Sequence, residues 1–129
     1  MRRLDLEVKE CIEKYKTQSM HYLKNAFNFI EVGDAEKASE FLWGSMAEAL
    51  KAVAASKEIW LKSHKDLRNY AIELARNLPD ESIRNTFLHA QSLHSNFYET
   101  GLLMEDVVAC AEEVRHTVGK LFALIDGRE

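Results

Sequence analysis

Apolar side chains recur every three or four positions along most of the chain, which is the periodicity of an amphipathic helix. Five such stripes follow one another, at residues 4–29, 35–53, 67–78, 83–97 and 104–125. The last stripe is the most regular and consists of Met104, Val107, Ala111, Val114, Val118, Leu121 and Ile125. No sustained alternation with the two-residue period of a β-strand interrupts them. The pattern predicts an all-α fold.

Capping residues mark the boundaries between the first three stripes. Gly33 suits the left-handed position that follows a helix, and Asp34 can then cap the start of the next one. Ser63 and Asp66 have the spacing of a capping box, which predicts a loop at about residues 57–62 and a third helix directly after it. Helices joined this tightly must fold back on each other.

The later boundaries fall at Pro79, which cannot continue a helix, and at Gly101. The 129 residues include only one proline and five glycines, and 47% of them are hydrophobic. Such a composition supports a buried core and leaves no obvious linker. We predict a single domain over residues 1–129, an antiparallel up-and-down bundle of four to five helices.

Charge and cysteine content narrow the range of partners. The formal charge of −4 and the pI of about 5.8 argue against binding to duplex DNA. The residues after Met1 are charged, and no run approaches the roughly eighteen apolar residues of a membrane span, so neither a signal peptide nor membrane insertion is expected. Cys11 and Cys110 lie among apolar residues, which favours buried free thiols in a reducing compartment. We expect a cytoplasmic protein.

The signatures of common nucleotide-binding and hydrolytic enzymes are missing from the sequence. Helical bundles that hold two iron ions use two Glu-x-x-His pairs, whereas this chain has one, Glu113 and His116, beside the last apolar stripe. His89 and His94 lie about 140° apart around a helix, which is a poor arrangement for chelation. We expect no metal site and no cofactor.

His94 is the most informative histidine because it falls on the apolar stripe of residues 83–97. One interpretation is a core histidine with a ring nitrogen bonded to a backbone or hydroxyl group. The other is a partly buried general acid or base that acts near Asn96, Tyr98 and Glu99. Spacing alone does not separate the two.

His64 stands at the start of the predicted third helix, in register with its apolar residues. If the bundle brings this position near the end of the fourth helix, His64 and His94 line one pocket; ring centres more than about 12 Å apart would exclude it. Trp43 has Gly44 as its neighbour, which permits close helix approach. For Trp43 we favour core or interface packing over ligand stacking.

Three segments together resemble a known family: "GDAEKASEFLWGSMAEALKAVAASK" at 33–57, "SHKDL" at 63–67 and "LHSNFYETGLLMEDVVACAEEVRHTV" at 93–118. In order and spacing they are similar to the archaeal PaREP family of small helical proteins. That family resembles in turn the HEPN superfamily, whose helical bundles commonly dimerise. The resemblance implies a homodimer.

Many HEPN domains are metal-independent ribonucleases that pair an Arg, a polar residue directly after it and a His a few residues further on, with two such motifs meeting in the dimer. Others have lost the motif and act as binding modules or toxin-system partners, often beside a nucleotidyltransferase. The resemblance therefore implies either an enzyme or a binding module.

Two alignments carry the motif onto this chain. In the first alignment, which is based on residue identity, the Arg, the polar residue and the His of the motif correspond to Arg84, Asn85 and His89. If the "LHSNFY" segment is aligned instead, His94 takes the histidine position, and His89 and Ala90 stand where the arginine and the polar residue belong. The second alignment fits its surroundings better and implies a degenerate motif, because a neutral imidazole does not hold a phosphate as a guanidinium does.

We therefore expect a dimeric binding or toxin–antitoxin-type module that acts on a partner protein, such as a nucleotidyltransferase, or on a nucleotide or RNA. The alternative is an active metal-independent endoribonuclease that uses His94 or His89 as the base and Arg84 as the phosphate clamp. The residues expected at the binding site are Asn96, Tyr98, Glu99, His64 and Trp43.

Overall fold

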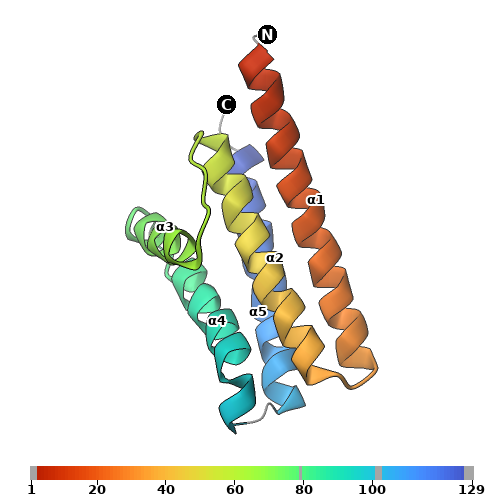
Figure 1. Ribbon diagram of the computed structural model, residues 1–129. Helices are drawn as coiled ribbons and strands as arrows, with labels where there is room; N and C mark the ends of the chain where they lie inside the picture. The colour runs from red at the N-terminus through yellow and green to blue at the C-terminus, as the bar shows by residue number, and fades with distance from the viewer. Residues whose placement is uncertain (1–2, 79, 101–102, 127–129) are drawn as a thin grey trace.

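The computed structural model describes residues 3–78, 80–100 and 103–126, except for the side chains of residues 3–4 and 96–100. The described part of the chain is built from helices and contains no strand (Figure 1). In chain order the helices are α1 (Arg3–Glu31), α2 (Ala35–Ser56), α3 (His64–Arg76), α4 (Ser82–Thr100) and α5 (Met104–Asp126). The predicted all-α fold is confirmed.

Four of these helices form an up-and-down bundle, and α3 lies across its side. In Figure 1, α1 descends, α2 rises, α4 descends and α5 rises, so that both hairpins turn at the same end of the molecule. The long connection from α2 passes through α3, which packs against α2 and α4. Helix α2 contacts each of the other four helices. It is therefore the element against which the rest of the fold is placed.

The capping predictions hold for the described boundaries. Gly33 has the left-handed φ of +83° expected after a helix, and the Asp34 carboxylate accepts a hydrogen bond from the Lys37 backbone N–H at 3.0 Å. Ser63 and Asp66 form a complete capping box at the start of α3. Pro79 and Gly101, the two later predicted boundaries, lie outside the described residues.

Small side chains let α1 and α2 approach each other closely. The Ser19 hydroxyl donates to the Ser45 backbone carbonyl at 2.7 Å, and the Ser45 hydroxyl donates to the Ser19 carbonyl at 2.9 Å. Both serines are fully buried. One position earlier, a Cβ atom on Gly44 would come within 2.9 Å of the Tyr22 ring. The expected role of Gly44 in close helix approach is confirmed.

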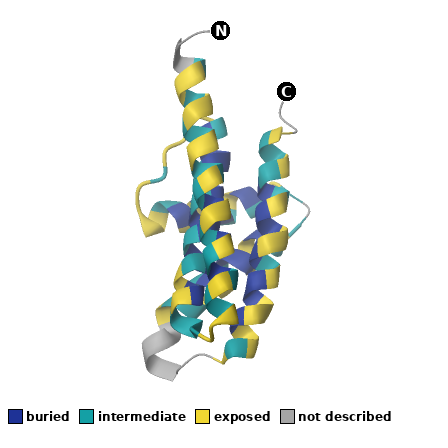
Figure 2. Ribbon diagram, turned by 90° about the vertical axis from the view of Figure 1, so that its right-hand side faces the viewer, coloured by how far each residue is buried: buried dark blue, intermediate teal, exposed yellow. Residues whose placement is uncertain are grey.

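The N-terminal half of α1 is less buried than its apolar stripe predicts. Helix α1 has 29 residues whereas α2 has 22, and its first turns extend past the end of the bundle (Figure 2). No residue from 5 to 18 is buried. Cys110 is buried as expected, but Cys11 lies in this segment and is only half-buried. The prediction of two buried thiols was therefore wrong for Cys11, because this part of α1 extends beyond the helices that would cover it.

None of the helices described is both long and apolar enough to cross a membrane.

Candidate functional site

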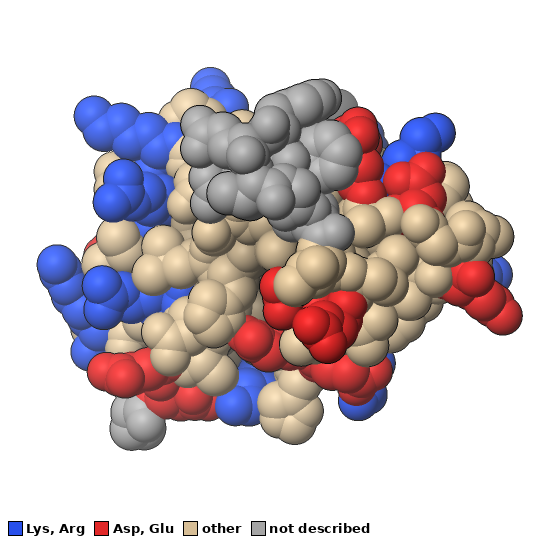
Figure 3. Space-filling model, turned by 90° about the horizontal axis from the view of Figure 1, so that it is seen from below, with Lys and Arg blue, Asp and Glu red and all other residues tan. Residues whose placement is uncertain are grey.

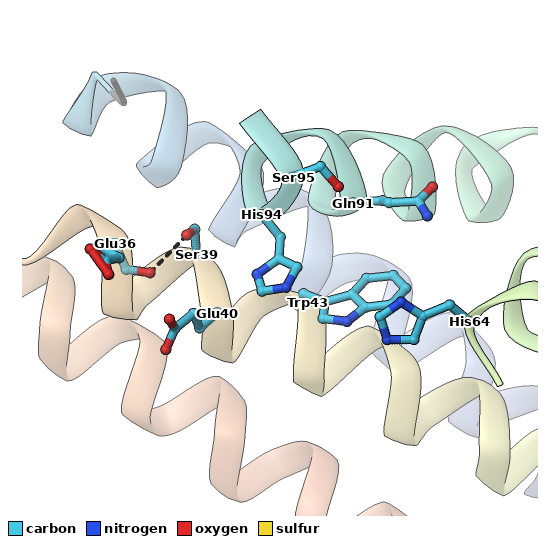
Figure 4. Close-up of a pocket in the computed structure, with 8 residues that line it drawn as sticks. All are labelled: Glu36, Ser39, Glu40, Trp43, His64, Gln91, His94 and Ser95. Atoms are coloured by element: carbon cyan, nitrogen blue, oxygen red, sulfur yellow. Dashed lines mark hydrogen bonds between the residues drawn. The ribbon is translucent and has the colours of Figure 1, made fainter. Parts of the chain in front are cut away.

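A pocket with a volume of about 400 Å³ lies where α2, α3 and α4 meet. Figure 4 shows side chains from all three helices around it. Most of them are polar: the lining residues are Glu36, Ser39, Glu40, Trp43, His64, Gln91, His94 and Ser95.

Helix periodicity explains why these residues converge. On α2, Glu36, Glu40 and Trp43 are spaced by four and then three positions, which places them on one face beside the buried stripe. On α4, the lining residues 94 and 95 follow residue 91 by three and four positions, so all three share one face of that helix. His64 is the first residue of α3, and the capping box fixes the direction in which the chain enters that helix.

Trp43 is the centre of the pocket wall. Its indole lies nearly parallel to the His94 ring, with 6.2 Å between ring centres, and edge-on to the His64 ring at 5.4 Å. The two imidazoles therefore contact the same indole and line one pocket, as the sequence suggested they would if the two helix ends met. Trp43 also contacts Phe87 in the core and is only 7% exposed. It packs in the core as expected, and its remaining surface faces the pocket.

His94 does not behave as the hydrogen-bonded core histidine of the first interpretation. It is half-buried, and its ring makes no hydrogen bond with any residue that the structure describes. Four other lining groups likewise form no hydrogen bond within the described part of the chain: the His64 ring, the Trp43 indole N–H and the side chains of Glu36 and Glu40. Polar groups that converge on a cavity without protein partners are available to a ligand.

His89 faces a different part of the molecule. Its Nδ1 lies 2.8 Å from the Glu113 carboxylate of α5, and the side chain of His89 is 59% exposed. Thr86 adds a 3.5 Å hydrogen bond to the same carboxylate and bonds Thr117 at 2.8 Å. Glu113 thus pairs with His89 from another helix, whereas sequence spacing had paired it with His116.

A buried thiol lies beside this pair. Cys110 lines the same shallow pocket as His89 and Glu113. Burial, with a smaller contribution from the Glu113 carboxylate, raises the pKa of the Cys110 thiol to about 12. A thiol that stays protonated is a poor nucleophile, so Cys110 serves packing.

The structure does not bring Arg84, His89 and His94 into one cluster within the chain. All three are on α4, where ten residues separate Arg84 from His94 by about 15 Å along the helix axis. Arg84 is exposed and makes no ion pair with any described residue. His89 turns toward α5 and His94 toward α2. One protomer alone therefore cannot place His94 and Arg84 on the same phosphate.

The other expected binding residues, Asn96, Tyr98 and Glu99, lie outside the described side chains. Sequence reasoning missed Glu36 and Glu40, whose spacing relative to Trp43 was the available signal. Among the described residues, no group of three or more His, Cys, Asp or Glu side chains is placed to hold a metal ion.

By architecture this is a small helical bundle with a polar pocket on one side. The model of the archaeal PaREP1/PaREP8 family matches residues 14–118, and the chain belongs to that family. A crystal structure of a Sulfolobus solfataricus protein superimposes with a TM-score of 0.72 at 24% sequence identity, covering 84% of this chain and 96% of that one. This similarity shows the shared fold. No curated protein matches the sequence.

Proposed function

We propose that this protein is a HEPN-like binding module, active as a cytoplasmic homodimer, whose ligand enters the pocket beside Trp43. The observation that carries the proposal is the set of polar side chains around that pocket with no partner in the described part of the chain. The HEPN resemblance suggests a partner protein, such as a nucleotidyltransferase, or a nucleotide or RNA. In this function the Arg, polar residue, His motif is not used for catalysis.

The nature of the pocket supports binding over RNA cleavage at His94. None of the described residues that line it is a lysine or arginine, so this described wall offers a scissile phosphate no permanently positive side chain. His94 is stacked against Trp43 and forms no hydrogen bond or ion pair with a titratable group in the described part of the chain. A general base in this position has no phosphate clamp.

Comparative capture tests the binding module. The tagged protein, a Gln91→Ala/His94→Ala variant and a control with exposed Asn69→Ala on α3 are incubated with extract from an archaeal host, and bound molecules are compared by mass spectrometry. We expect a molecule retained by the native and control proteins and lost from the pocket variant. If all three retain the same set of molecules, the pocket is not the binding site and the proposal fails.

Ribonuclease activity is the second candidate, because His89 has the geometry of an oriented base. The Glu113 carboxylate at 2.8 Å holds Nδ1 and leaves Nε2 for chemistry, while exposed Arg84 stands five residues earlier on the same helix. A site of this kind needs the dimer to bring two helices together. Of the two alignments of the motif, the one that uses Arg84 and His89 is supported by the contact between His89 and Glu113.

Cleavage of single-stranded RNA in EDTA tests this candidate. The native protein is compared with Arg84→Ala, His89→Ala and His94→Ala variants. Cutting that is lost with Arg84→Ala and His89→Ala but kept with His94→Ala would establish the ribonuclease. Absence of cutting by a folded, dimeric native protein would exclude it.

The homodimer is supported by apolar side chains left on the surface of α1. Leu6 and Met20 are each 50% exposed. They are fourteen positions apart, so both lie on nearly the same side of the helix. Light scattering at micromolar concentration should give twice the monomer mass; a monomer mass would rule out the dimer.

A further inference from the structure

We propose that the pocket beside Trp43 binds a guanidinium group. This inference rests on the proposed function and names the chemistry of its ligand. A guanidinium is planar, always positively charged and made only of hydrogen-bond donors. The pocket offers charge, hydrogen-bonding groups and aromatic surface that match each of these properties.

The charge of the pocket is negative. Glu36 and Glu40 stand one helical turn apart on α2, and neither carboxylate forms an ion pair with a described residue. Because no lysine or arginine is among the described residues that line the pocket, the permanent charges of this described lining are both negative. A cation that bridges the two carboxylates would relieve their mutual repulsion, whereas a phosphate would add to it.

Basic and acidic side chains are unevenly distributed over one end of the molecule (Figure 3). Figure 3, a view onto the end where both hairpins turn, shows the largest group of lysine and arginine side chains on the left, the side of α3, while aspartate and glutamate are spread over the lower left, the middle and the right. On α3 itself the bases include Lys65, Arg68 and Arg76. None of these three bases is among the described residues that line the pocket.

Hydrogen-bonding capacity also favours a donor-rich ligand. Both carboxylates accept hydrogen bonds, and the side chains of His64, Gln91, His94 and Ser95 can each accept one as well. Among the described lining groups, the indole N–H of Trp43 is the one limited to donation. A ligand with several N–H groups can thus donate hydrogen bonds to most of the lining groups that have no partner.

The aromatic wall suits a flat cation. The His94 ring lies at 13° to the indole plane, and the His64 ring stands edge-on beside it. Planar guanidinium groups stack on such rings while their edges form paired hydrogen bonds with carboxylates. A compact ammonium group would use the carboxylates but not the rings.

Calorimetric titration with matched ligands tests the proposal. The probes are n-butylguanidine, as a small free guanidine with no second charge, and N-acetylarginine amide, as a guanidinium carried by a peptide; N-acetylcitrulline amide replaces the guanidinium by a neutral urea. We expect at least one guanidinium probe to bind and the citrulline probe to bind about tenfold more weakly or not at all. Binding of n-butylguanidine alone identifies a small free guanidine, and binding of the arginine probe alone identifies a protein side chain.

Three variants locate the binding. Glu36→Gln and Glu40→Gln should each weaken guanidinium binding about tenfold, because each removes one charged acceptor. Glu73→Gln makes the same change at an exposed position of α3 outside the pocket and should have no effect. In a Trp60→Phe background, Trp43 is the only one of the two tryptophans left, so its fluorescence reports whether the probe reaches the pocket.

Other results overturn the inference in distinguishable ways. Equal binding of the arginine and citrulline probes, or binding unaffected by both pocket variants, would show that guanidinium is not recognised there. A change in Trp43 fluorescence with inorganic phosphate, but with neither guanidinium probe, would show that the pocket binds a ligand and that this ligand is not a cation. If no probe binds but comparative capture finds a molecule that depends on the pocket, only the proposal of a guanidinium ligand is refuted. If neither the titrations nor the capture experiment detects binding at the pocket, the proposed binding module is refuted as well.

Discussion

The reciprocal serine pair between α1 and α2 allows a quantitative prediction. Ser19 and Ser45 are fully buried, and each hydroxyl donates to the backbone carbonyl of the other residue. Either carbonyl lies inside a helix and keeps its own helical hydrogen bond if the partner hydroxyl is removed. Ser19→Ala or Ser45→Ala should therefore lose one buried hydrogen bond without leaving an unsatisfied acceptor.

The expected cost is about 1 kcal/mol of unfolding free energy for each substitution. The two hydroxyl oxygens are 3.2 Å apart, the longest of the three contacts, so most of the interaction goes to the carbonyls. The two losses should then be nearly independent. The double variant should lose about 2 kcal/mol, with a coupling energy below about 0.5 kcal/mol.

Urea unfolding of the native protein, both single variants and the double variant measures these values. Exposed Thr17→Ala on α1 is the control, and it should change the free energy of unfolding by less than about 0.5 kcal/mol. The slope of free energy against urea should stay constant across the set. A double variant no less stable than either single one would refute the reasoning, because it would mean that the hydroxyls bond chiefly to each other.

Three further predictions follow from individual contacts. Ellman's reagent should label Cys11 in the native protein and Cys110 only on unfolding, because burial raises the pKa of Cys110 to about 12; equal native labelling of both would contradict this. Asp80 bonds Lys120 at 2.7 Å, and this contact first, then bonds from Ser82, lowers its pKa well below 3.8. The ionised Asp80 carboxylate therefore stabilises the fold above about pH 4, and this stabilisation is lost as the pH falls further. When urea unfolding is measured at successively lower pH, the free energy of unfolding of Asp80→Asn should fall less than that of the native protein. An equal fall in both proteins would contradict this. Gly44→Ala should lower the free energy of unfolding by about 1 kcal/mol, since crowding against the Tyr22 ring outweighs the gain in helix propensity; a higher melting temperature would show that α1 can shift.

The fold could be predicted from the sequence because helix periodicity and capping are local properties. The Ser63 capping box and the Asp34 cap each depend on residues three positions apart, and both occur where the sequence placed them. The half-exposure of Cys11 could not be predicted in this way. A stripe shows which side of a helix is apolar, whereas its burial depends on how far the neighbouring helices extend.

The candidate site could be predicted only in part, for a related reason. Sequence position selected Trp43, His64 and His94, but their convergence depends on how α3 crosses the bundle. Glu36 and Glu40 were missed because a charged residue beside an apolar stripe usually faces solvent. The pairing of His89 with Glu113 joins residues 24 positions apart on two helices, and no local pattern in the sequence encodes such a contact.

The spacing of His89 and His94 now separates the two candidate functions. Five residues turn a helix by about 140°, so one imidazole faces α5 and the other faces α2. A single site within one chain cannot use both. His94→Ala should therefore impair ligand binding and leave any ribonuclease activity in place, while His89→Ala should do the reverse. If either substitution abolished both activities in a folded protein, the two faces of α4 would have to meet across the dimer, and the separation of roles within one protomer would be wrong.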